Sequence, residues 1–206
     1  IETCFKKRSS KERRILMCLI LILVLTTFTF NGSASVSYLF ERKKFGWKLE
    51  QHNVFEVANI SLAIFGSIIG LTILQKYCKV SEMSLVFLSI SSGILDATLK
   101  AFASAGWQMY VISAIALFRL LFNPVIRAMI TIIVPQSEIG KVFAATITLE
   151  ALASLMSSLL YTGVYTKTIM FFPGAFFLIT ACAFSINLLL SIFVKMMQRT
   201  SFYAIN

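Results

Sequence analysis

Six apolar runs, each about as long as a membrane-spanning helix, constrain this chain more than any other feature. A helix needs about 20 mostly apolar residues to cross the hydrocarbon core of a bilayer. Only 14% of the 206 residues are charged, against about 25% in a typical soluble domain. Because so few polar side chains cannot cover a globular surface, the apolar faces must meet lipid. The runs are Ile15–Phe40, Val54–Leu74, Met83–Phe102, Met109–Val134, Val142–Tyr165 and Phe172–Val194.

Short segments that are polar or contain Gly and Pro separate these runs, as helix–helix connections do. The pattern predicts an all-α membrane protein whose six-helix transmembrane bundle covers residues 15–195. The first predicted connection is Glu41–Asn53. We expect residues 1–14 to be a basic cytoplasmic segment at the end of a central loop, and residues 196–206 to be a cytoplasmic tail. The first residue is Ile1 rather than Met, which favours a fragment of a longer protein.

The basic residues predict the orientation of the bundle, because cytoplasmic connections are enriched in Lys and Arg. Six crossings place both termini on one side, with eleven basic residues there and five on the other. We therefore predict cytoplasmic termini, in a plasma or lysosomal membrane. This distribution also argues against a nucleic-acid partner, despite the net charge of +10. The eleven are Lys6, Lys7, Arg8, Lys11, Arg13, Arg14, Lys76, Lys79, Lys141, Lys195 and Arg199, and the five are Arg42, Lys43, Lys44, Lys48 and Lys167.

Charged residues inside the predicted spans are functional candidates, because a charge near the bilayer centre is costly. Asp96 and Lys100 lie four apart on one helix face, so they can neutralise each other or act in transport. Glu150 belongs to a stripe of polar residues on one side of the fifth run. This stripe either lines a pathway or forms hydrogen bonds to a neighbouring helix. Carboxylates in apolar surroundings can exchange protons near neutral pH, which makes Asp96 and Glu150 candidates for proton coupling. The other stripe members are Thr146, Ser154, Ser157 and Tyr161.

The fourth run contains Arg119, Asn123 and Arg127 at helical spacing, with Pro124 between the arginines. Proline removes a backbone donor, so the run predicts a kink at Pro124. A guanidinium group can bind a carboxylate or phosphate through two parallel hydrogen bonds. Bent helices are common at transporter binding sites. We therefore expect an anionic solute to contact side chains from several spans. The candidates for solute binding are Arg127, Arg119, Asn123, Lys100 and Tyr161.

Two further patterns concern packing and metal binding. Gly66 and Gly70 form a small-residue motif that predicts close helix packing within the bundle rather than a dimer contact. Asn59 begins a formal glycosylation sequon, but it lies inside a predicted span, so we expect that sequon to be unused. The four cysteines and the single histidine, His52, lack metal-site spacing. We expect neither a metal nor a cofactor.

Several ordered segments in the second half of the chain resemble solute carrier family 46, which includes the proton-coupled folate transporter. They are Asn123-Pro-Val-Ile-Arg127-Ala, Ser137-Glu-Ile-Gly140-Lys141-Val-Phe143-Ala, Glu150-Ala-Leu, Leu160-Tyr161, Val164-Tyr165 and Phe172-Pro173-Gly174-Ala-Phe-Phe. The resemblance is strongest over Asn123–Phe177 and looser over Ile15–Gln108.

The resemblance implies the C-terminal half of a twelve-helix major facilitator fold, whose N-terminal six-helix half would lie in cis. It also implies proton-driven transport of an organic anion, such as a folate, a muropeptide or a cyclic dinucleotide. In the folate member, the arginine at the position of Arg127 matters for transport. That member also has a functional histidine in its seventh helix, whereas Thr26–Ser37 contains none. The resemblance therefore favours another solute of the family over folate.

Two other classes of function fit the composition. A membrane enzyme would need His, Cys or paired carboxylates at the interface, and His52 has only Glu50 and Glu56 near it in sequence. We therefore do not expect an enzyme. A truncated six-span protein with a structural or regulatory role could instead pair with a full-length relative.

Overall fold

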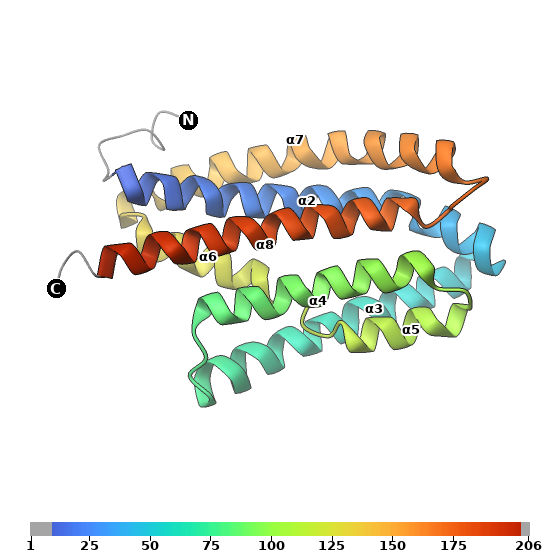
Figure 1. Ribbon diagram of the computed structural model, residues 1–206, viewed down its shortest axis with the longest axis horizontal. Coiled ribbons are helices and arrows are strands. Elements are labelled where there is room, and N and C mark those ends of the chain that lie inside the picture. The colour runs from blue at the N-terminus through green and yellow to red at the C-terminus, as the bar shows by residue number, and fades with distance from the viewer. Residues whose placement is uncertain (1–9, 203–206) are drawn as a thin grey trace.

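The computed structural model describes residues 10–202, and every regular element in this range is a helix. This confirms the predicted all-α membrane fold. Five helical stretches have the length and apolar composition of a membrane span, and one apolar helix is shorter. The elements in Figure 1 are α2 (Ser10–Phe45), α3 (Leu49–Ile69), the π-helix η1 (Gly70–Tyr77), α4 (Glu82–Phe102), α5 (Gly106–Ile115), α6 (Phe122–Ile133), α7 (Gln136–Thr168) and α8 (Ala175–Phe202).

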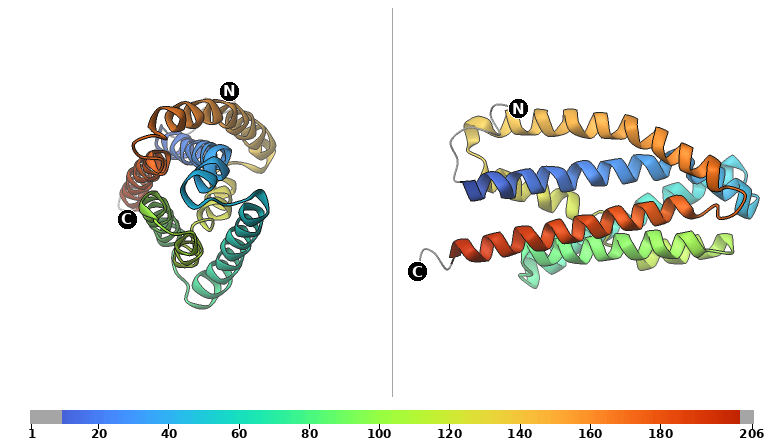
Figure 2. Two further views of the ribbon diagram at one scale, coloured as in Figure 1. Left: turned by 90° about the vertical axis from the view of Figure 1, so that its right-hand side faces the viewer. Right: turned by 45° about the horizontal axis from the view of Figure 1, so that its top comes forward.

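The helices run back and forth along one axis, so the start of α2 and the end of α8 lie at the same end of the bundle (Figure 1). The π-helix η1 continues α3, and α5 with α6 makes one interrupted crossing. Helix α2 packs along α7 and α8, and α4 packs along α8. The end-on view in Figure 2 shows α3 at the periphery, away from α7. The described chain thus crosses the bundle six times.

Several boundaries differ from those expected from the sequence. The predicted connection Glu41–Asn53 is mostly helical, because α2 continues to Phe45 and α3 begins at Leu49. Residues 10–14 and 196–202, predicted to be a cytoplasmic segment and a tail, continue α2 and α8. The remainder of those two segments, 1–9 and 203–206, lies outside the described residues. Charged side chains concealed the helical character of these ends, since hydropathy detects the membrane core rather than the whole helix.

The outer faces of α3 and α7 are strongly apolar and exposed, as expected for surfaces in contact with lipid. On α3, Val54, Val57 and Phe65 are each at least 60% exposed, and on α7, Leu155 and Leu159 are at least 70% exposed. The buried cores lie between the helices instead. One gathers around the first half of α2, α6 and the start of α4, and a second, rich in aromatic rings, surrounds Phe40 and Phe176.

The fourth crossing is interrupted between Ile115 and Phe122, so α5 and α6 are separate helices. We refer to residues 116–121 as the α5–α6 break. The sequence predicts a kink at Pro124, and the interruption lies just before it, with Pro124 in the first turn of α6. Proline at that position is physically consistent, because first-turn N–H groups have no partner within the helix.

Two features outside the crossing accommodate the α5–α6 break. A Cβ atom at Gly66 would collide with the backbone oxygen of Leu117, and one at Gly70 would lie 2.7 Å from Leu121 Cδ2. The Gly66–Gly70 motif therefore packs within the bundle, as predicted. From α4, the Ser89 hydroxyl donates to the Phe118 oxygen at 2.7 Å and accepts from the Phe122 N–H at 3.0 Å. These bonds satisfy backbone groups that an unbroken helix would pair internally.

Candidate functional site

A cavity lies among α2, α3, α4, α5, α8 and the α5–α6 break. It encloses about 790 Å³ of space between side chains, including its open part. Helix α2 supplies one polar wall, and the opposite wall carries most of the charge. The lining residues are Thr26, Thr29, Phe30, Ser33, Ala34, Ser37, Glu41, Phe55, Glu56, Asn59, Asp96, Ala97, Lys100, Met109, Arg119, Leu120, Phe122, Phe177, Thr180 and Phe184.

Asp96, Lys100 and Arg119 form the charged centre of this cavity. Lys100 is only 5% exposed, and its Nζ atom lies 2.9 Å from Asp96 Oδ1 and 3.0 Å from Oδ2. Arg119 Nη1 is 3.7 Å from the same Oδ1 atom. Two cations thus share one carboxylate, which leaves this trio with a net positive charge. The spacing of Asp96 and Lys100 correctly predicted their contact.

Asn59 on α3 holds Arg119 in place across the cavity. Arg119 Nη2 donates to the Asn59 side-chain oxygen at 2.6 Å and to its backbone oxygen at 3.0 Å. Ser113 donates to the same side-chain oxygen at 2.7 Å. Because Arg119 lies in the α5–α6 break rather than on a continuous helix, these bonds fix its direction. Sequence reasoning missed this role of Asn59, although a polar amide in an apolar span is itself a signal.

Asn123, Arg127 and Glu150 form a separate cluster that does not line the cavity. Arg127 donates to both carboxylate oxygens of Glu150, at 2.8 and 2.9 Å, and to the Asn123 side chain at 3.0 Å. The Arg127 side chain is 34% exposed, while that of Glu150 is 10% exposed. The predicted ladder from Arg119 to Arg127 is therefore divided by the helix break. Arg119 faces the cavity, whereas Arg127 connects α6 to α7 through its ion pair with Glu150.

Tyr161 lies in the aromatic core between α2, α7 and α8 rather than on the cavity wall. Its hydroxyl forms a 2.9 Å hydrogen bond with Thr180, which does line the cavity. Gly32 on α2 makes room for the ring, since a Cβ atom there would collide with it. Two other members of the polar stripe, Thr146 and Ser157, are fully buried, whereas Ser154 is half-buried. Thr146 and Ser157 donate to backbone oxygens of α7 itself.

Two groups of residues, one lining the cavity and one partly beside it, were not predicted from the sequence. The polar face of α2 repeats at three- and four-residue intervals, and this periodicity could have revealed it. The second group joins the end of α2 to the start of α3. There His52 Nδ1 lies 2.6 Å from Glu41 Oε2, and Glu56 is close to both. Glu41 and His52 are 11 residues apart on different helices, so sequence spacing gave no sign of their contact.

The cavity combines apolar walls with few, firmly held charges, which suits the binding of an organic ion. Lys100 and Arg119 supply hydrogen-bond donors that a carboxylate or phosphate could accept. The side-chain nitrogen and oxygen atoms of Glu41, His52 and Glu56 lie within 4.8 Å of one another. These features describe a polytopic all-α membrane protein with a charged cavity between its helices.

Comparison with known proteins agrees with this class. The chain is 36% identical over 191 residues to the probable peptidoglycan muropeptide transporter SLC46 of Drosophila melanogaster, covering 91% of this chain and 37% of the relative. It is 29% identical over 178 residues to the lysosomal proton-coupled steroid conjugate and bile acid symporter SLC46A3 of Mus musculus, covering 86% and 38%. It is 34% identical over 119 residues to the proton-coupled folate transporter of Bos taurus, covering 56% and 25%.

The chain is thus a relative of solute carrier family 46, which confirms the resemblance found in the sequence. No protein-family model matches it. The chain spans less than two-fifths of the length of these curated relatives. The names of these relatives are those of membrane transporters.

Proposed function

We propose that this chain is the C-terminal half of a secondary active transporter that moves an organic anion across a membrane together with protons. The observation that carries the proposal is the pair of cations, Lys100 and Arg119, in the cavity. Within residues 10–202, Asp96 is the only carboxylate bonded to them. A solute carboxylate or phosphate could replace water, or part of Asp96, at these donors. The membrane would be a plasma or lysosomal membrane, with both termini in the cytoplasm.

The names of the relatives support this class of solute. They specify muropeptides, steroid conjugates, bile acids and folate, and bile acids and folates carry carboxylates. Two of the names also specify proton coupling. Transporters of this kind alternate access around a site between two halves. The open cavity would form one wall, and a further six-helix half in cis would form the other.

Uptake measurements test this proposal. A complete carrier containing this chain would be expressed in cells and given labelled muropeptide, bile acid or folate at acidic and neutral external pH. A charged hydrogen bond contributes about 1.5–3 kcal/mol, so Lys100→Gln and Arg119→Gln should each lower apparent affinity roughly tenfold to a hundredfold. Lys167→Gln is the matched control, because that lysine is exposed at the end of α7.

The proposal would be supported if Lys100→Gln and Arg119→Gln each weakened the apparent affinity for an anion while Lys167→Gln kept normal uptake. Unchanged uptake in both cavity variants at normal surface expression would contradict it. Anion uptake that depends on Arg127 but not on Lys100 or Arg119 would place the solute site at the α6–α7 cluster instead. This last outcome would support the solute-binding role that the sequence predicted for Arg127 and Asn123.

A further inference from the structure

Glu41, His52 and Glu56 form a cluster at one end of the cavity. Glu41 is fully buried, and its Oε2 atom lies 2.6 Å from His52 Nδ1. Its other oxygen, Oε1, is buried and has no hydrogen-bond partner among the described residues. Glu41 and Glu56 both line the cavity, and the His52 ring lies beside Tyr38. A buried carboxylate with an unused oxygen is a costly arrangement that a bound proton would relieve.

The partners of this cluster differ from those of the other membrane carboxylates. Asp96 is held by Lys100 and Arg119, and Glu150 by Arg127. Arginine keeps its charge at any physiological pH, so those carboxylates always face a cation. The hydrogen-bond partner of Glu41 is instead a histidine, whose ring nitrogens can gain or lose a proton. A proton added at this cluster therefore changes the charge of the cavity without breaking a permanent ion pair.

We propose that the Glu41–His52 pair, with Glu56, is the proton-binding site that makes the cavity receptive to an anion; this rests on the proposed function above. The charged residues lining the cavity are Glu41, Glu56 and Asp96 against Lys100 and Arg119, an excess of one negative charge. One proton on the cluster cancels this excess, and a second makes the cavity positive. The anion and the proton then favour each other's binding by the same factor.

The groups that face the cluster come from three sides. His52 and Glu56 lie on α3, Lys100 and Asp96 on α4, and Arg119 in the α5–α6 break. On α2 itself, Lys44 lies over the Phe40 ring, and Arg42 and Lys43 are exposed. The cluster belongs to the α2–α3 end of the bundle, opposite the described chain ends (Figure 1). With the predicted orientation, this end faces the exterior or the lysosomal lumen, where an acidic solution would supply the proton.

A direct test uses the fact that the chain contains a single histidine. The 206-residue chain, labelled with ¹⁵N-histidine and placed in lipid nanodiscs, would be titrated by NMR. A neighbouring carboxylate stabilises the imidazolium, so Glu41→Gln should move the His52 midpoint downward by about one pH unit, a tenfold loss of proton affinity. Glu50→Gln is the matched control, since Glu50 is an exposed carboxylate of α3 outside the cluster.

An equal midpoint in the wild-type and Glu41→Gln chains would overturn the proposal. His52 signals that stay fixed with pH but shift when zinc chloride is added would also overturn it, because the cluster would then be a metal site. In the complete carrier, Glu41→Gln should shift the pH profile of uptake, whereas Lys100→Gln should weaken uptake at every pH. The NMR titration needs no transport, so it distinguishes failure of this inference from failure of the proposed function.

Discussion

Asp96 is the shared counter-ion of the cavity cations, and its position makes it sensitive to substitution. Lys100 is 5% exposed, so it has little water to replace a lost partner. Removing one member of a buried ion pair costs about 3–5 kcal/mol, whereas replacing both members can be nearly neutral. The cluster around Arg127 differs, because that side chain is 34% exposed and water can hydrate it. The two ion pairs should therefore respond differently to loss of their acids.

Asp96→Asn should destabilise the bundle by about 3 kcal/mol, because it leaves Lys100 and Arg119 without a carboxylate. Glu150→Gln should cost about 1 kcal/mol or less, since Arg127 is partly hydrated. The double variant Asp96→Asn/Lys100→Met should recover most of the stability lost in Asp96→Asn. Denaturant unfolding of the reconstituted protein measures all three. A double variant no more stable than Asp96→Asn would show that the unpaired lysine is not the cause.

At this scale, contacts within one helix could be predicted from the sequence, whereas contacts between helices could not. The contacts Asp96–Lys100 and Asn123–Arg127 follow from a four-residue spacing on one helix. The bonds from Arg127 to Glu150 and from Arg119 to Asn59 join residues 23 and 60 positions apart. Such pairs depend on how helices pack, which periodicity within one helix does not encode. This is why two clusters appear where the sequence predicted one site.

At the scale of elements, the α5–α6 break shows the largest departure from a regular span. Pro124 correctly signalled an irregular fourth crossing, because it removes a backbone donor. The exact location of the interruption depends on α3 and α4, which supply Gly66 and Ser89 to it. Gly66 and Ser89 therefore stabilise the break in the neighbouring crossing, in addition to their place in α3 and α4.

Gly66→Ala should destabilise the bundle by about 1–3 kcal/mol, because its methyl group would collide with the Leu117 backbone. Gly163→Ala is the control, since nothing lies within 4 Å of a Cβ at this position of α7. The control should be neutral or stabilising, as alanine favours helix over glycine by roughly 1 kcal/mol. Thermal unfolding in nanodiscs compares the two. Equal effects would mean that Gly66 is not tightly packed.

Ser89→Ala should cost about 1–3 kcal/mol, because it leaves the Phe118 oxygen and the Phe122 N–H without their side-chain partner. Ser67→Ala is a suitable comparison, since the Ser67 hydroxyl donates only to the Ala63 oxygen of its own helix. Faster hydrogen exchange at Phe122 in Ser89→Ala, but not in Ser67→Ala, would locate the effect at the break. Unchanged exchange at Phe122 would contradict this role.

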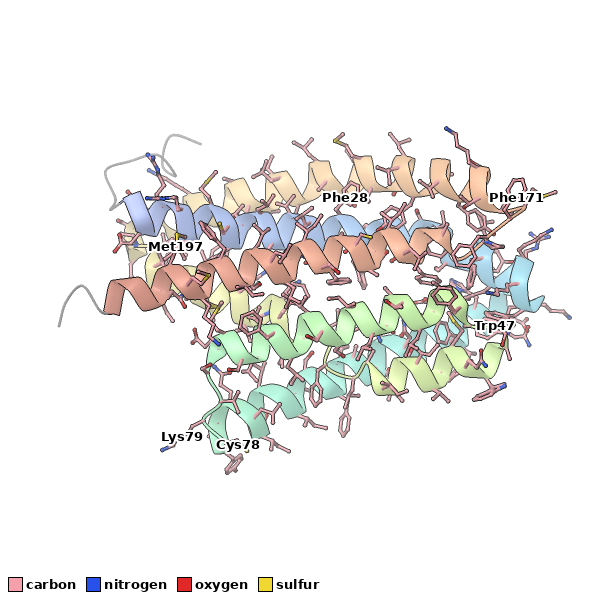
Figure 3. The ribbon with its side chains drawn as sticks, viewed as in Figure 1. Phe28, Trp47, Cys78, Lys79, Phe171 and Met197 are labelled. Carbon is pink, nitrogen blue, oxygen red and sulfur yellow. The ribbon has the colours of Figure 1, made fainter. Side chains whose placement is uncertain are left out.

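At the scale of the whole molecule, six crossings bring the two ends of the described chain together (Figure 1). The apolar runs predicted this arrangement, because hydropathy counts crossings reliably even where helix ends are misjudged. Figure 3 shows Cys78, Lys79 and Met197 towards that end and Trp47 and Phe171 at the opposite end. The central position of α2, between α7 and α8, could not be predicted. Its apolar run is about as hydrophobic as that of the peripheral α3, so hydropathy alone does not separate the two helices.

The predicted orientation makes Cys78 a cytoplasmic thiol and places Lys167 outside. In intact cells, an impermeant maleimide should label a Lys167→Cys variant at once, while Cys78 should react only after permeabilisation. Cys78 is exposed and so accessible to the reagent. A Cys78→Ser background identifies the labelled site. Immediate labelling of Cys78 in intact cells would invert the orientation and place the Glu41–His52 pair at the cytoplasmic end.

The α5–α6 break also has an electrical consequence. The amino end of a helix carries a partial positive charge of about half an electron unit from its unpaired N–H groups. Leu120 and Phe122 line the cavity, so the amino end of α6 lies at its wall. This macrodipole is a property of the backbone and does not titrate. Replacing both Lys100 and Arg119 should therefore weaken anion binding yet leave a residual preference for negative charge that no side-chain substitution removes.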